Sequence, residues 1–156
     1  MAAGHSDSIK TVAQQNCNLL LDQFSPVSTV MERVKIFNDE LNSLGIKNKP
    51  QIALARAMYI AKDQKEKEEV IEKRLKAREN VDKLSQRPDG NNTSSIMVYK
   101  GTDEAYNGAL IGTKEEIIDR IHALKDGGIN YILLVDNGSG IKGLDKFANE
   151  IMPSIH

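Results

Sequence analysis

Residues 109–140 read ALIGTKEEIIDRIHALKDGGINYILLVDNGSG, and this stretch decides the fold class. Thr113 and Glu116 have the spacing of a capping box, in which each side chain accepts a hydrogen bond from the other residue's main-chain N–H. An amphipathic helix follows, and a Gly-Gly pair ends it. Residues 131–135, YILLV, are a continuous apolar run, which predicts a strand. A tight glycine loop and a last helix complete a helix–strand–helix unit.

The same alternation runs through the first half of the chain. The expected elements there are a helix over 6–15, a strand over 18–22 (NLLLD), a helix with Pro26 at its first position, a strand over 51–61 (QIALARAMYIA) and a charge-rich helix over 63–84. Ser6 and Ser25 are placed to cap the first two helices, and Gly45 to end the second. Residues 85–106 carry strong turn signals, which predict an insertion loop.

Alternating strands and helices predict an α/β fold with a parallel sheet and right-handed crossovers, in one domain over residues 1–156. An eight-stranded βα barrel takes about 250 residues. The 156 residues with three strands would therefore hold only part of such a barrel. Because three strands cannot close a ring, we expect apolar strand and helix surface to be exposed and to favour association. Arg56 lies among the apolar residues of the strand over 51–61, where a structural ion pair is expected to neutralise it.

The composition excludes several classes of function. The formal net charge is −1, from 21 basic and 22 acidic residues, so no basic excess indicates binding to nucleic acid or to an anionic membrane. The longest apolar run falls far short of the ~20 residues that a membrane span needs. A single cysteine, Cys17, cannot form an internal disulfide, which fits a reducing cytoplasm. One cysteine and three scattered histidines provide no metal-ligand cluster.

Ligands of βα proteins bind in the loops that follow the strands. The loop over residues 4–8 places His5, Ser6 and Ser8 at the start of a helix, where hydroxyls and main-chain N–H groups can bind a phosphate. Simple capping of the helix by Ser6 is the alternative, and composition alone favours it. The loop over 136–140 is rich in glycine, but the carboxylate of Asp136 would repel a phosphate, so we interpret it as a structural turn.

Four stretches resemble the luciferase-like, flavin-dependent monooxygenases. GHSDSIKTVAQQNCNLLLDQFSP is similar to the part of that family that leaves the fifth barrel strand and enters the sixth, and IALARAMYIAKD is similar to the seventh strand. ALIGTKEEIIDRIHALKDGGINYILLVDNGSG resembles the closing helix, turn and eighth strand, and KFANEIMP resembles the final helix. The resemblance covers most of the chain. It implies a partial (β/α)₈ TIM barrel made of the C-terminal strands six to eight with their flanking helices.

The family implies an oxidoreductase, a flavoprotein that uses FMN, or alternatively the deazaflavin F420, to oxidise a small organic substrate. The flavin phosphate of such proteins lies in the loop after the fifth strand, which the resemblance places at His5, Ser6 and Ser8. Ser8 matches the second hydroxyl of the motif, whereas His5 replaces a common serine. The first five strands have no counterpart, so the resemblance implies no catalytic residue.

Two functions therefore remain. The first is a segment of a flavin-dependent monooxygenase, whose partner is the missing N-terminal barrel half or a second copy of the chain. The second is a non-catalytic remnant or interaction domain that keeps the fold pattern. Because flavin oxygenation needs an enclosed site, we expect the isolated chain neither to hold flavin tightly nor to turn over a substrate.

Overall fold

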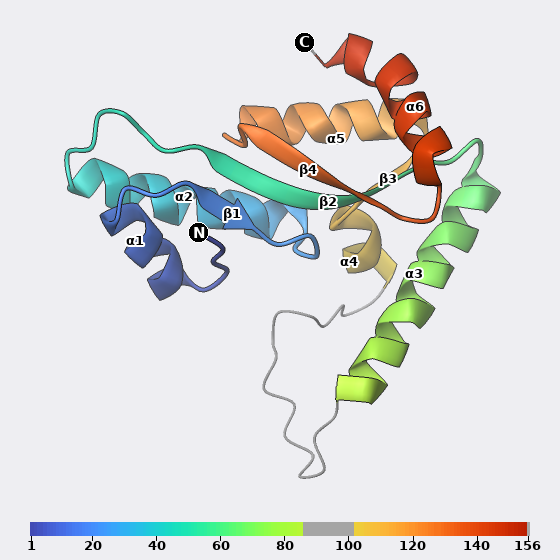
Figure 1. Ribbon diagram of the computed structural model, residues 1–156, viewed down its shortest axis with the longest axis horizontal. Helices are drawn as coiled ribbons and strands as arrows, with labels where there is room; N and C mark the ends of the chain where they lie inside the picture. The colour runs from blue at the N-terminus through green and yellow to red at the C-terminus, as the bar shows by residue number, and fades with distance from the viewer. Residues whose placement is uncertain (86–101, 156) are drawn as a thin grey trace.

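The computed structural model describes residues 1–85 and 102–155, and Figure 1 shows their arrangement. The helices and strands, in chain order, are α1 (Ser6–Gln14), β1 (Leu19–Leu21), α2 (Val27–Ser43), β2 (Ile52–Ile60), α3 (Gln64–Ser85), α4 (Thr102–Asn107), β3 (Leu110–Gly112), α5 (Lys114–Asp126), β4 (Tyr131–Asp136), α6 (Gly140–Glu150) and the short 3-10 helix η2 (Met152–Ser154). The predicted insertion loop lies outside the described residues over 86–101, and its last part forms α4.

The sheet is parallel, as the sequence predicts, and β2 is its centre. β1 pairs with the first part of β2, β3 pairs with the last part, and β4 pairs with it from Ala53 to Met58. Ala2 adds an isolated parallel bridge to Leu20 of β1. The three predicted strands are confirmed as β1, β2 and β4. The sequence interpretation missed β3, because three residues are too few for a periodic pattern to show.

Two of the predicted helix starts are wrong. The cap of α1 is His5, whose backbone is extended, and Ser6 is already the first helical residue. The cap of α2 is Pro26, not Ser25, and the helix begins one residue later. Ser25 instead donates its hydroxyl to the carboxylate of Asp22, which removes it from the helix end. The capping box of Thr113 with Glu116 is confirmed at the start of α5.

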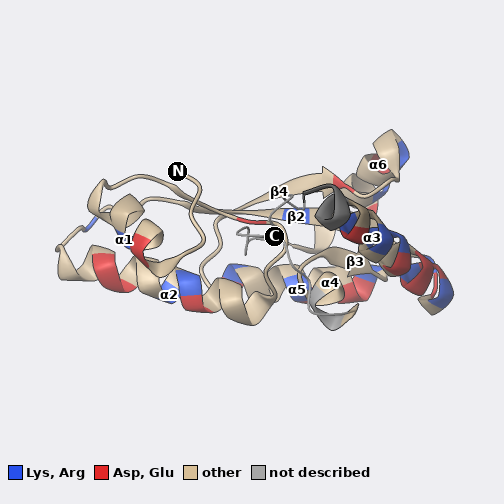
Figure 2. Ribbon diagram, turned by 90° about the horizontal axis from the view of Figure 1, so that it is seen from below, with Lys and Arg blue, Asp and Glu red and all other residues tan. Residues whose placement is uncertain are grey.

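Helices pack mainly on one face of the sheet. In Figure 2, α1, α2 and α5 lie together on one side of the strands, while the long α3 projects away with many charged residues along it. The main core joins that helical layer to alternate residues of β1 and β2. Its largest fully buried members are Ile9, Leu19, Leu21, Phe37, Leu41, Leu54, Met58, Leu110, Ile117 and Leu124. This helical layer therefore covers one face of the sheet with a close-packed core.

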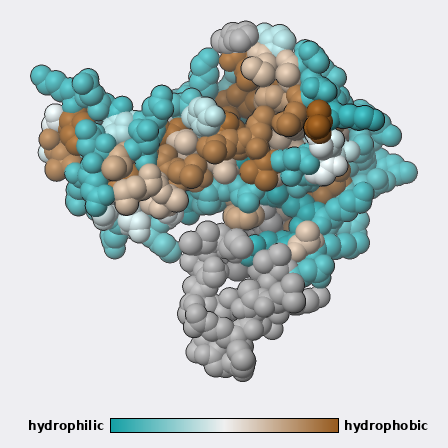
Figure 3. Space-filling view, in the orientation of Figure 1, coloured by the Kyte–Doolittle hydropathy of each residue, from teal (hydrophilic) through white to brown (hydrophobic). Residues whose placement is uncertain are grey.

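The opposite face of the sheet is only partly covered. A smaller core around Ala57 and Ile111 joins this face to α3 and α4. Further along, Tyr131, Leu133 and Val135 of β4 remain exposed on that same face, since they pair in register with Ala53, Ala55 and Ala57. Figure 3 shows apolar side chains gathered in a band across the strands. The sequence prediction of exposed apolar surface is therefore confirmed.

Among the described residues, no helix combines the length and the apolar character that crossing a bilayer requires.

Candidate functional site

A pocket of about 490 Å³ lies where β1 ends and the N-terminal segment turns into α1. Its walls come from residues 2–5, from the end of β1, from Arg33 of α2 and from Ala55 of β2. Ala55 belongs to the open face of the sheet, so the pocket opens on that face. Its volume falls within the roughly 300–1,000 Å³ of small-molecule sites. Its position, at the carboxyl end of a parallel strand, is where βα proteins bind ligands.

The N-terminus of α1 borders this pocket. His5 lines it, but Ser6 and Ser8, although exposed in the first turn of α1, are not part of the wall. The first main-chain N–H groups of a helix have no acceptor within the helix, and no side chain caps α1. This helix end is therefore able to receive hydrogen-bond acceptors from a ligand. Asp7, in the same turn, is a carboxylate that would oppose a bound anion.

Arg33 brings a positive charge to the same place. The guanidinium lies over Gly4, since a Cβ added at that glycine would lie 3.6 Å from Nη2 of Arg33. Its Nη1 donates to the carboxylate of Asp22 and, at 2.7 Å, to the hydroxyl of Ser25. Only 19% of the Arg33 side chain is exposed, so the guanidinium is held in one orientation. The arginine thus connects the loop after β1 to the loop before α1.

Asp22 organises the loop after β1. Its carboxylate accepts hydrogen bonds from the main-chain N–H groups of Phe24 at 2.7 Å and Ser25 at 2.8 Å. Burial raises the pKa of Asp22, but these N–H donors, the Ser25 hydroxyl and Arg33 together lower that pKa below its ordinary value of 3.8. Asp22 is therefore a carboxylate at neutral pH, and Arg33 offsets its charge.

Arg56 of β2 also contacts the loop after β1. The side chain is fully buried, and it donates to the main-chain oxygens of Asp22 at 3.1 Å and Ser25 at 2.7 Å. The sequence led us to expect an ion pair at this position, and the described residues show hydrogen bonds from the guanidinium to main-chain carbonyls, which hold it in place. Helix α3 adds Arg74, which donates to the oxygen of Gln23 and lies 5.9 Å from the centre of the Phe24 ring. The loop is thus held from three sides.

The glycine loop after β4 is a structural turn, as the sequence predicts. The carboxylate of Asp136 accepts the main-chain N–H groups of Gly138, Ser139 and Gly140, at 3.2, 2.9 and 3.0 Å. These are the donors that an anion would otherwise use. Within residues 1–85 and 102–155, no group of three or more metal-binding side chains comes together.

Sequence reasoning identified the loop over residues 4–8, which brings Gly4 and His5 to the pocket wall, but it missed Arg33. Arg33 stands on a helix surface where a charged residue is ordinarily solvated, and only the fold reveals that it reaches Asp22, which precedes it by eleven residues. The repeated pattern of Asp followed three residues later by Ser, at Asp22 and Asp136, is the one signal that could have identified both turns.

Known proteins share this fold. No protein-family model matches the sequence, and no curated protein sequence matches it. Among solved structures, an F420-dependent secondary alcohol dehydrogenase in complex with an F420–acetone adduct is similar to 99% of this chain, with 18% identity and a TM-score of 0.68. The oxygenating constituent of 3,6-diketocamphane monooxygenase from Pseudomonas putida, a type II Baeyer–Villiger monooxygenase in complex with FMN, also matches 99% of the chain, with 14% identity and a TM-score of 0.66.

A third match is the coenzyme F420-dependent tetrahydromethanopterin reductase from Methanopyrus kandleri, similar over 100% of this chain with 16% identity and a TM-score of 0.65. The chain spans only about half the length of these proteins, with 48%, 47% and 50% of each covered. At such identities the similarity shows the fold alone. The resemblance seen in the sequence thus agrees with the structure: the chain has the fold of one part of luciferase-like enzymes.

Proposed function

We propose that this chain is the C-terminal part of a flavin-dependent oxidoreductase barrel and that its pocket binds the phosphate end of FMN or, alternatively, of F420. In this proposal β1, β2 and β4 are barrel strands six, seven and eight, and the open face of the sheet is turned toward the barrel interior. The substrate is a small organic molecule, and the cytoplasm is the expected compartment, since the single cysteine can form no internal disulfide.

One observation carries the proposal: a positive helix end and a guanidinium converge on one pocket at the carboxyl end of a parallel strand. His5 and Arg33 both line that pocket, and the N-terminus of α1 borders it. A phosphate accepts hydrogen bonds from both kinds of donor, because guanidinium forks and helix N-termini each suit its oxygens. Ser6 and Ser8 stay in the proposal as hydroxyl donors, which a phosphate seated above the first turn of α1 would reach.

A bound reduced flavin would supply the redox chemistry. The residues of this chain would anchor and orient it: α1 and Arg33 hold the phosphate, while the Asp22 loop keeps the pocket wall fixed. Phe24 and Ala55 give the pocket an apolar side that could receive the rest of the cofactor. Because the strands of the remaining barrel are needed to exclude water, we expect the isolated 156-residue chain to bind flavin weakly and to catalyse no oxidation.

The test is a fluorescence titration of FMN and of F420 against the chain completed by a barrel half. The barrel half comes from the matched alcohol dehydrogenase and is the part of that enzyme that this chain does not resemble. Ser8→Ala should weaken cofactor binding by about 1 kcal/mol, the contribution of one hydrogen bond. Arg33→Gln should weaken it by about 2 kcal/mol, because a charge-assisted bond is lost.

Ser28→Ala is the matched control, since Ser28 is also an exposed serine in the first turn of a helix, but of α2 rather than α1. It should leave the affinity unchanged. A completed barrel that binds the cofactor equally well with Ser8→Ala and Arg33→Gln would reject the phosphate assignment. Substrate-dependent oxygen uptake by the isolated chain with reduced FMN would reject the idea that the enclosed site needs the missing strands.

A further inference from the structure

The sequence contains two Asn–Gly pairs, Asn107–Gly108 and Asn137–Gly138. An asparagine followed by glycine is prone to a reaction within the chain, in which the main-chain nitrogen of the glycine attacks the side-chain amide carbon of the asparagine. Glycine favours this attack because it has no Cβ to shield its nitrogen. The two pairs share the same chemistry, so their surroundings in the fold decide which of them reacts.

The first pair lies in a protected position. Asn107 is the last residue of α4, and helical main-chain dihedral angles hold the next nitrogen away from the side-chain carbon of the asparagine. Gly108 is buried, and so are Ala105 and Ala109 on either side of the pair. These two alanines belong to the small core that joins α3 and α4 to the sheet. Ring closure at this pair therefore requires that core to open.

The second pair lies in the turn between β4 and α6, outside any helix or strand. Gly138 is exposed, with a φ of 97° that glycine adopts more readily than other residues. Among the described residues, nothing lies within 4 Å of the position that a Cβ would take at Gly138, so no neighbouring group blocks the ring that the reaction forms. The N–H of Asn137 donates to the oxygen of Met58 at 3.3 Å, which holds the asparagine at the end of the strand.

A proton acceptor already faces the nitrogen that would attack. The N–H of Gly138 donates to the carboxylate of Asp136 at 3.2 Å, which is the longest of the three main-chain hydrogen bonds to that carboxylate. This distance is within the reach of a general base. The acceptor is thus a side chain at the surface, and its bond to Gly138 can open without disturbing a helix or the sheet.

We propose that Asn137 is a site of spontaneous deamidation in the folded chain, and that Asn107 is protected from the same reaction. A bond forms between the nitrogen of Gly138 and the side-chain carbon of Asn137, the bond from that carbon to its amide nitrogen breaks, and ammonia leaves with the proton that Gly138 loses. The product is a cyclic imide. Water then opens the imide at either carbonyl, which leaves aspartate or isoaspartate at position 137. This modification needs no cofactor and is independent of the proposed function.

The modification would change the start of α6. Isoaspartate adds one carbon to the main chain, and either product adds a carboxylate next to Asp136. The first turn of α6 depends on Asp136, whose carboxylate bonds the N–H and the hydroxyl of Ser139 and the N–H of Gly140. Like charges and a longer main chain both oppose these bonds. We therefore expect the first turn of α6 to loosen.

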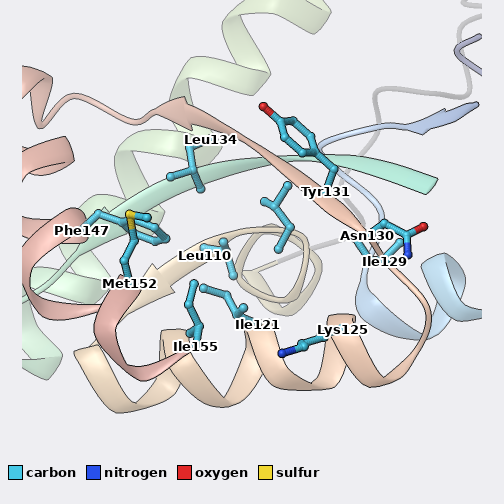
Figure 4. Close-up of a pocket in the computed structure, with 11 residues that line it drawn as sticks. Leu110, Ile121, Lys125, Ile129, Asn130, Tyr131, Leu134, Phe147, Met152 and Ile155 are labelled. Carbon is cyan, nitrogen blue, oxygen red and sulfur yellow. The ribbon is translucent and has the colours of Figure 1, made fainter. Parts of the chain in front are cut away.

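The far end of α6 is held in another way. In Figure 4 the side chains of Phe147 and Leu110 extend into one apolar groove, which lies between α6, α5 and β4. Phe147 is only 7% exposed, and Ile151, just after the helix, is fully buried. This packing does not involve the turn after β4, so the last turns of α6 should stay in place after the modification.

The experiment incubates the full chain in warm, mildly alkaline buffer and follows both pairs by peptide mapping with mass spectrometry. Electron-transfer fragmentation locates the gain in mass and distinguishes isoaspartate from aspartate. The same chain unfolded in guanidinium chloride gives the rate of each pair without structure, and there the two pairs should react at similar rates. In the folded chain Asn137 should react at least about tenfold faster than Asn107, because only the second pair is exposed without opening of a core.

Two matched variants link the reaction to its effect on α6. After incubation, the main-chain amides of residues 141–143 in the wild type should exchange with solvent about tenfold faster than before, whereas those of α5 should not change. Asn137→Gln should keep the exchange rates of the fresh wild type, because glutamine must close a larger ring and reacts far more slowly. Asn107→Gln is the control and should age as the wild type does.

Three results would overturn the proposal. One is an equal gain in mass at the two pairs of the folded chain. Another is an Asn137 that reacts in guanidinium chloride but not in the folded chain, which would mean that the Asp136 turn protects it. The last is faster exchange at residues 141–143 in aged Asn137→Gln, which would assign the loosening of α6 to a different change.

Discussion

Replacement of the buried Arg56 by methionine should destabilise the chain by about 3–5 kcal/mol, because it removes two hydrogen bonds from a charged group and leaves their main-chain acceptors without this donor. The guanidinium donates to the main-chain oxygens of Asp22 and Ser25, which belong to the loop that frames the pocket. A hydrogen bond from a charged group contributes about 1.5–3 kcal/mol, so two such bonds account for most of this loss. Because burying a charge is itself costly, the removal of the guanidinium restores part of the lost stability. The expected loss is therefore smaller than the sum of the two hydrogen-bond contributions.

Urea unfolding followed by circular dichroism measures the change, at protein concentrations low enough to suppress association. For a chain of this size the loss corresponds to a fall of about 10 °C in Tm. Leu54→Met is the matched control, since Leu54 lies on the same face of β2 and is equally buried. It should cost less than about 1.5 kcal/mol. If Arg56→Met cost no more than this control, the claim that Arg56 holds the loop would be refuted.

Three further changes have definite expected outcomes. Asp22→Asn should flatten the acid dependence of stability. The lowered pKa of Asp22 means that its carboxylate stabilises the fold above its ordinary pKa of 3.8 and loses this effect as the pH falls through the lowered value, so urea titrations should show the difference between wild type and variant shrinking as the pH falls below 3.8. Thr113→Ala should cost about 1 kcal/mol in the same assay, because the capping box of α5 is lost, and an unchanged midpoint would contradict that role. Gly143→Ala should cost about 1–3 kcal/mol, because the new Cβ would lie 1.9 Å from the Oγ of Ser139; adding Ser139→Gly should recover stability, and failure to do so would exclude this clash as the cause.

The order of strands and helices was predictable from the sequence because the signals are local. The strand over residues 131–135 is an unbroken apolar run, and Thr113 with Glu116 marks a helix start by spacing alone. Ser25 shows where local reasoning fails: its hydroxyl could cap α2, yet Asp22 offers a competing acceptor at 2.9 Å that the pattern does not reveal. Strand β3 is fixed by pairing with β2, a contact across some fifty residues that no short window contains.

The candidate site was predictable only at its N-terminal end. A glycine followed by His5 and serines before an amphipathic helix has the pattern of a helix start that binds anions. Arg33 has no such pattern, because a cation on a helix is ordinarily exposed to water. Its role depends on the packing of α2 against α1, which brings its guanidinium beside Gly4. Long-range packing, rather than composition, therefore decides which charges face the pocket.

The turns after β1 and β4 explain why an anion would bind at one and not at the other. In both, an aspartate accepts the N–H and hydroxyl of a serine three residues later, so Asp22 and Asp136 fold their loops in the same way. Among the described residues, Asp136 is exposed and bonded by neutral donors, so its negative charge stays on the loop. Asp22 is paired with Arg33, whose second nitrogen lies nearest to Gly4. The charge of the first loop is therefore balanced, and the loop presents an N–H donor of Arg33 beside the start of α1, whereas the second loop keeps a negative charge; the electrostatics of the strand ends thus favour the phosphate of a cofactor at the first loop over the second.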